Sequence, residues 1–173
     1  MVAMGTDANR LDDPDDAAAL AGHAKALADA VDAALPGWVV RVVLERWARW
    51  SGPDGPPAPD ALRDAAREAG DQARSEVLPA LRALLASDVD EQRSNPLALI
   101  RAAVRYPSSV LAQAGMPPVE RDADARRLFP DDVYDLAPAA FADLDASVHE
   151  PGLVWGAAKA HVILARRRRA GQR

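Results

Sequence analysis

The chain has 173 residues, of which 49% are hydrophobic and 27% are charged, and its formal net charge is −5. This length and composition are typical of one soluble globular domain. Cysteine is absent, which excludes disulfides, thiolate metal sites and a cysteine nucleophile. The N-terminal residues have no apolar stretch of the kind found in signal peptides, and the longest apolar run, residues 151–165, is too short to span a bilayer. We therefore expect a cytoplasmic protein with no membrane contact.

Aromatic residues make up only 5% of the chain, and much of its hydrophobic content is alanine, which buries little area per residue. These features predict helices that pack closely with a thin margin of stability. Basic charge is carried by nineteen arginines and two lysines. This bias, together with the excess of Ala, Asp and Pro, is typical of high-GC bacteria and indicates no function.

Residues 1–12 are predicted to be a flexible N-terminus, and residues 13–165 a helical domain. Asp13 as N-cap and Pro14 at the first helical position predict a helix that ends near Leu35, before the Pro-Gly pair. Residues 36–50 contain four valines that favour a strand by propensity, but no second strand candidate exists to pair with them. We therefore expect a second helix over 36–50. Its tryptophans are expected to fill the core, the alternative being that one is an exposed anchor for a partner.

Residues 51–58 are predicted to be a Pro- and Gly-rich internal linker whose stiffness holds the neighbouring helices apart. From Pro59, Leu and Ala residues recur at helical spacing to Leu84, which predicts a long amphipathic helix. Pro79 lies inside this helix and cannot donate a backbone hydrogen bond, so a kink or break is expected there. A further helix begins at Pro96, with a bend or restart at Pro107.

The segment from Arg126 to Asp145 holds both phenylalanines of the chain and one of its two tyrosines, between prolines and acids. Pro130 and Pro138 each predict a short helical turn, and short turns do not stabilise themselves. An irregular segment becomes ordered only by burying large side chains in a groove of its own chain or of a partner. Both alternatives stay open.

Residues 151–165 predict a final helix, followed by a basic C-terminal tail over 166–173. Residues 120–150 hold nine acids and three arginines, a net charge of −6, whereas residues 151–173 carry +6. One interpretation is an internal pairing of the two segments, which is worth little per exposed pair. The other is that Arg166, Arg167, Arg168 and Arg169 bind the phosphates of RNA or DNA. The net charge of −5 and the lack of an aromatic residue in the tail weigh against it.

Catalytic and metal-binding patterns are absent from the sequence. The three histidines share no ligand spacing, and there is no phosphate-binding glycine loop or nucleophile elbow. No cofactor and no metal site are predicted. An enzyme that uses His149 or His161 is the least supported reading.

The sequence therefore predicts an all-α, single-domain bundle of about six helices, with an irregular Pro- and aromatic-containing segment before the C-terminal helix. The leading hypothesis is a non-enzymatic interaction module or accessory subunit of a cytoplasmic bacterial complex. It binds a protein partner or a second copy, and its candidate anchors are Phe129, Tyr134, Phe141 and Trp155. The alternative is a nucleic-acid or ribosome-associated protein that acts through Arg166 to Arg169.

Overall fold

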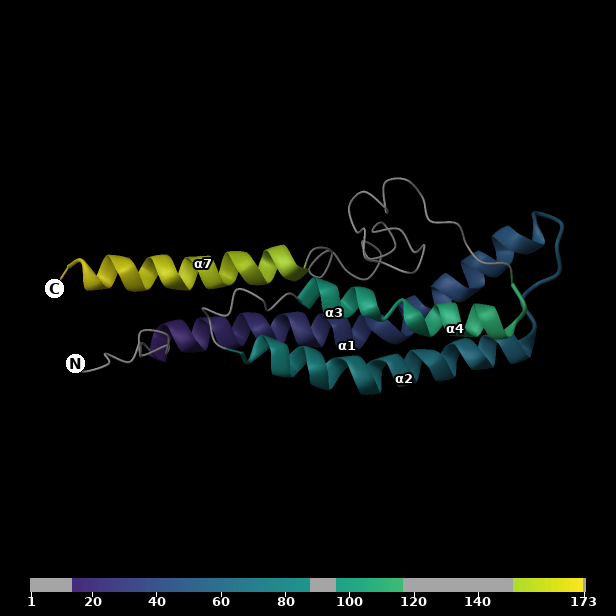
Figure 1. Ribbon diagram of the computed structural model, residues 1–173, viewed down its shortest axis with the longest axis horizontal. Helices are drawn as coiled ribbons and strands as arrows, with labels where there is room; N and C mark the ends of the chain where they lie inside the picture. Colours follow the sequence, from purple (N-terminus) through teal and green to yellow (C-terminus); the bar gives the residue numbers. More distant parts are fainter. Residues whose placement is uncertain (1–13, 88–95, 117–150, 173) are drawn as a thin grey trace, which may run out of the picture.

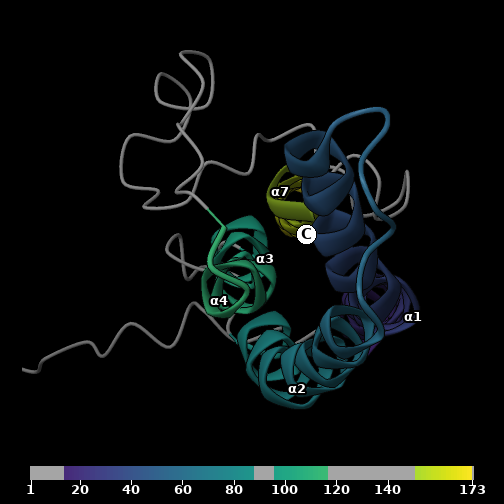
Figure 2. The ribbon, with the colours of Figure 1, turned by 90° about the vertical axis from the view of Figure 1, so that its right-hand side faces the viewer.

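The computed structural model describes residues 14–87, 96–116 and 151–172. Within these ranges the chain is all-α without a strand, as predicted, although the predicted number of about six helices is not shown. The helices are α1 (Pro14–Ser51), α2 (Asp60–Leu85), α3 (Pro96–Ala102), α4 (Arg105–Gln113) and α7 (Pro151–Ala170). Figure 1 shows α2 and α7 running antiparallel to α1 along the length of the molecule. Seen from one end, α1, α2, the α3–α4 pair and α7 occupy four positions of a bundle (Figure 2).

Helix α1 is continuous through Pro36, so the prediction of two helices that meet there is wrong. A proline inside a helix removes one hydrogen bond and costs about 3 kcal/mol. Large apolar side chains on both sides of Pro36 are buried, among them Leu35 and Trp38, and burying each contributes about 1.5–3 kcal/mol. Burial on both sides therefore outweighs the cost of the proline, and one long helix results.

The connection from α1 to α2, residues 52–59, does not hold the two helices apart, contrary to prediction. Gly52 takes a positive φ of 81°, and the backbone N–H of Gly55 donates to the Gly52 carbonyl at 3.1 Å. The indole N–H of Trp47 donates to the Pro56 carbonyl, also at 3.1 Å, and fastens the connection to α1. The prolines therefore stiffen a tight reversal, and α2 returns along α1.

Helix α2 is not broken at Pro79, which is exposed, because Leu78 and Leu81 beside it are buried in the core. At Gly70 the backbones of α1 and α2 approach each other closely. A Cβ atom built on Gly70 would lie 2.8 Å from the carbonyl oxygen of Pro36. Because this contact is with backbone, only glycine allows the two helices to lie so close.

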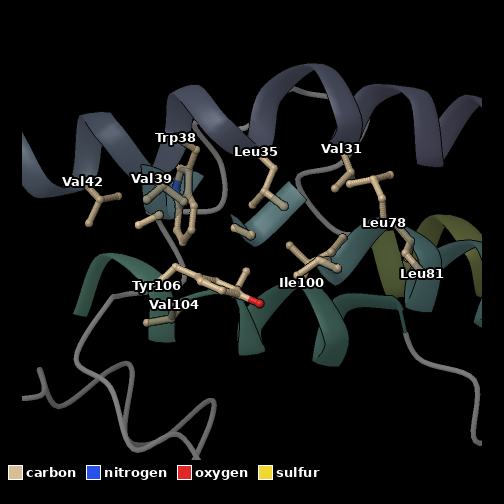
Figure 3. Close-up of a cluster of buried hydrophobic side chains, with 14 of the residues drawn as sticks. Val31, Leu35, Trp38, Val39, Val42, Leu78, Leu81, Ile100, Val104 and Tyr106 are labelled. Carbon is tan, nitrogen blue, oxygen red and sulfur yellow. The ribbon is translucent and has the colours of Figure 1, made fainter. Parts of the chain in front are cut away.

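The core is formed by apolar side chains from α1, α2, the α3–α4 region and α7, and Figure 3 shows part of it between α1, α2 and the α3–α4 region. Its labelled members are Val31, Leu35, Trp38, Val39, Val42, Leu78, Leu81, Ile100, Val104 and Tyr106. The bend between α3 and α4 lies at Ala103 and Val104 and not at Pro107, which falls within the first turn of α4. Both residues of the bend are buried, so the turn itself packs on α1 and α2.

Candidate functional site

Of the four predicted anchor residues, Phe129, Tyr134 and Phe141 lie outside the described residues. Trp155 lies in the first half of α7 with 0% of its surface exposed. An indole with no exposed surface contacts no partner while α7 is docked, so the role of Trp155 as an anchor stays a prediction. In this aromatic-poor chain, Trp155 is used to fill the contact between α7 and α1.

The surroundings of Trp155 are unusually polar for a core. The imidazole of His23 on α1 stacks near its ring, with 6.5 Å between ring centroids and 25° between planes. The ammonium of Lys159, itself only 7% exposed, lies 5.3 Å from the indole centroid, within range of a cation–π interaction. Buried Nε2 of His23 and Nε1 of Trp155 have no hydrogen-bond partner among the described residues.

The four arginines predicted to bind nucleic acid are helical, because α7 continues to Ala170 and leaves little separate tail. Arg167, Arg168 and Arg169 are exposed, and Arg166 is half-buried. Arg169 donates to the carboxylate of Asp16 in the first turn of α1. Arg169 therefore forms an ion pair within the protein, while Arg167 and Arg168 are exposed on the surface at one end of the bundle.

An apolar groove that the sequence did not reveal lies between the first half of α1 and the end of α2. Its volume is about 390 Å³. The groove is lined by Ala17, Leu20, Ala21, Ala24, Lys25, Ala28, Asp29, Arg82, Leu85, Ala86 and Ser87. It exists because α2 ends at Leu85, while α1 extends past this point with small alanine side chains on its surface.

The charged groups at the rim of this groove are paired locally. Lys25 donates to Asp29 one helical turn away, and Arg82 lies 3.5 Å from the carboxylate of Asp32. Asp32 also accepts a hydrogen bond from Arg74, so one carboxylate of α1 joins two arginines of α2. The charged side chains at the rim are thus paired with one another around a surface of alanine and leucine, an arrangement suited to an apolar ligand.

A second hollow, of about 500 Å³, lies between α2 and α4 and is polar. The Tyr106 hydroxyl donates to Glu76, and the Arg105 guanidinium lies 3.0 Å from the same carboxylate. The bonds that Tyr106 and Gln72 donate hold the pKa of Glu76 below its ordinary value, while burial is the main cause that raises the pKa of Tyr106. Glu76 therefore stays ionised and hydrogen-bonded, which makes this cluster a tie between α2 and α4 and not an acid–base pair.

In the described ranges, no three His, Asp or Glu side chains gather closely enough to hold a metal ion. No helix there is both long and apolar enough to cross a membrane. Comparison with known proteins found no matching family model, no matching curated protein and no matching solved structure.

Proposed function

We propose that this protein is a non-enzymatic interaction module, an adaptor or accessory subunit that binds a helix of a protein partner. The observation that carries this proposal is the apolar groove between α1 and α2. Grooves of this kind receive the apolar face of an amphipathic helix, with anchor residues at i, i+3, i+4 and i+7.

The small apolar side chains that line the groove indicate what kind of helix would bind there. The side of α1 that lines the groove carries the small side chains of Ala17, Ala21 and Ala24. A second helix can therefore approach α1 closely and place large side chains between α1 and the end of α2. Each methylene group that the partner buries contributes about 0.8 kcal/mol. The expected partner segment is therefore a helix with Leu- or Met-like side chains on one face and few charges beside them.

The test is purification of the tagged protein from its own host, with washes at low and high salt, using two matched variants of α1. Ala21 is exposed and lines the groove, whereas Ala26 is exposed and does not. A stoichiometric protein that survives high salt should be lost with Ala21→Glu and retained with Ala26→Glu. Equal retention by both variants, or no salt-resistant partner at all, would overturn the proposal.

The segment from residue 126 to 155 belongs to the same proposal, with Phe129, Tyr134 and Phe141 as further anchors. Replacing Phe129 or Tyr134 by Ala should abolish the complex while helical content, measured by circular dichroism, stays constant. Loss of helical content would instead assign these side chains to the protein's own core.

A second candidate function is the binding of RNA or DNA phosphates through the end of α7. It is supported by Arg167 and Arg168, which are exposed side by side on one helical turn. Such binding is electrostatic and weakens steeply as salt concentration rises. It should disappear when Arg166 to Arg169 are all changed to Gln. Binding that is insensitive to salt or to this change would exclude it.

A further inference from the structure

Trp50, near the end of α1, is 50% exposed and is the largest exposed apolar side chain in the described ranges. The chain contains only four tryptophans, and the indoles of Trp38 and Trp155 are buried in the core. Tryptophan is enriched among the residues that dominate binding at protein interfaces. An indole left half in water therefore makes the end of α1 a candidate binding surface.

Trp50 is not an isolated apolar side chain. Its ring lies against that of Trp47, with 5.1 Å between centroids and 56° between planes. Pro53, Pro56 and Pro57 in the adjoining connection are exposed and line, together with Trp47, a hollow of about 310 Å³. Two indoles and three prolines thus gather where the chain turns from α1 into α2 (Figure 1).

The other indole of this pair, Trp47, already binds a proline-rich segment of its own chain. Its N–H donates to the carbonyl of Pro56 at 3.1 Å, and Pro57 borders the hollow beside it. Aromatic surfaces bind proline-rich segments because these are already extended and make no internal hydrogen bonds with their backbone carbonyls. The N–H of Trp50, by contrast, has no hydrogen-bond acceptor among the described residues.

We propose that Trp50 binds a proline-rich segment of a protein partner in the extended polyproline conformation. A proline ring of the partner stacks on the exposed face of the indole, and the N–H of Trp50 donates to a carbonyl of the partner. The contact repeats between two proteins what Trp47 and Pro56 do within this one. A proline-rich segment is extended before it binds and Trp50 is held on a helix, so little order has to be gained on binding.

This surface is separate from the groove between α1 and α2. The residues of α1 that line the groove run from Ala17 to Asp29, and Trp50 lies about 30 Å beyond Asp29 along the helix. The binding of a proline-rich segment therefore does not depend on the groove, and either site can be altered without the other.

Iodide quenching of tryptophan fluorescence in the full chain measures whether Trp50 is accessible in solution. The quenched fraction should fall in Trp50→Phe, because this change removes the most exposed indole while Trp38 and Trp155 stay buried. An unchanged fraction would show that the chain itself covers Trp50 and would overturn the proposal.

A peptide of about ten prolines tests the ligand, with the indole N–H signals of the isotope-labelled full chain followed by nuclear magnetic resonance. The signal that is missing from Trp50→Phe identifies Trp50. In the wild type this signal should move as peptide is added, while those of Trp38 and Trp155 stay in place. No movement up to about 5 mM peptide, or equal movement with a serine peptide of the same length, would contradict the proposal. Movement on raising the protein concentration alone would assign the surface to a second copy and would also contradict it.

The affinity for the proline peptide should weaken at least tenfold in Trp50→Ala, with helical content unchanged by circular dichroism because the residue lies at a helix end. Leu164→Ala is the matched control, since Leu164 on α7 is also exposed, by 53%, and should leave the affinity unchanged. Equal losses in both variants would rule out a specific site at Trp50. The groove variant Ala21→Glu should bind the peptide as the wild type does, which separates this proposal from the one for the groove.

Discussion

Among the contacts of helix α1, those with α2 and with α7 differ in character. The contact with α2 is apolar and close, with Leu35 and Leu81 fully buried and Gly70 against the backbone of Pro36. The contact with α7 contains a buried lysine, and two ring nitrogens there have no hydrogen-bond partner among the described residues. Unmatched buried polar atoms lower the free energy of unfolding. The comparison indicates that α1 and α2 form the stable frame, and that α7 is the helix that opens first.

The largest effect is expected where α1 and α2 are closest. Gly70→Ala forces a Cβ atom against the Pro36 carbonyl, so the helices must move apart, at a cost of about 1–3 kcal/mol in the free energy of unfolding. Gly37 is the matched control, because a Cβ there meets nothing within 4 Å. Gly37→Ala should stabilise the protein by about 0.5–1 kcal/mol through helix propensity. Urea unfolding of both variants measures the difference, and equal effects would refute the close contact.

A smaller effect, of the opposite sign, is expected where α1 meets α7. His23→Leu removes a buried nitrogen that has no partner in the described part of the chain. Leaving such an atom unmatched costs about 1–3 kcal/mol, so the variant should be more stable by about 1 kcal/mol in urea unfolding. A loss of stability would mean that Nε2 of His23 is hydrogen-bonded in solution. The contact with α7 would then not be weakened by an unmatched polar atom, and the contrast with the α2 contact would be lost.

The smallest effect is expected from Arg169→Gln, which removes the ion pair with Asp16 at the edge of the same contact. The Arg169 side chain is 44% exposed and that of Asp16 is 10% exposed, so solvent screens the pair only in part, and its loss should lower the free energy of unfolding by about 1 kcal/mol. Hydrogen exchange should therefore become faster in α7 and remain unchanged in α2. Faster exchange in both helices would show that they unfold as one unit and would remove the distinction between them.

The all-α class was predictable because helical spacing of Leu, Val and Ala runs through most of the chain. The continuity of α1 through Pro36 was not, because the burial that outweighs the proline comes from packing against α2 and not from neighbouring residues of α1. The groove was missed for a similar reason. Ala17, Ala21 and Ala24 look like ordinary surface alanines until the end of α2 at Leu85 is placed beside them.

The burial of Trp155 in the core also could not be predicted from the local sequence. Tryptophan is favoured both in cores and at interfaces, and neighbouring residues do not distinguish the two. Trp155 is buried because it lies on the side of α7 that faces His23 on α1. These two residues are more than a hundred positions apart in the sequence. Arg166 to Arg169, predicted as part of a tail, belong to the last turns of α7, where their charge suits the negative end of the helix dipole.

The tight reversal at residues 52–59 has a consequence for the order in which the chain folds. It joins two long helices that follow one another directly in the chain, so their contact needs no later part of the chain. We therefore expect the hairpin of α1 and α2 to form before residues 151–170 are synthesised, since a chain is made from its N-terminus. Helix α7 therefore docks onto a frame that already exists, and the face of α1 that receives it is bare while the rest of the chain is being made.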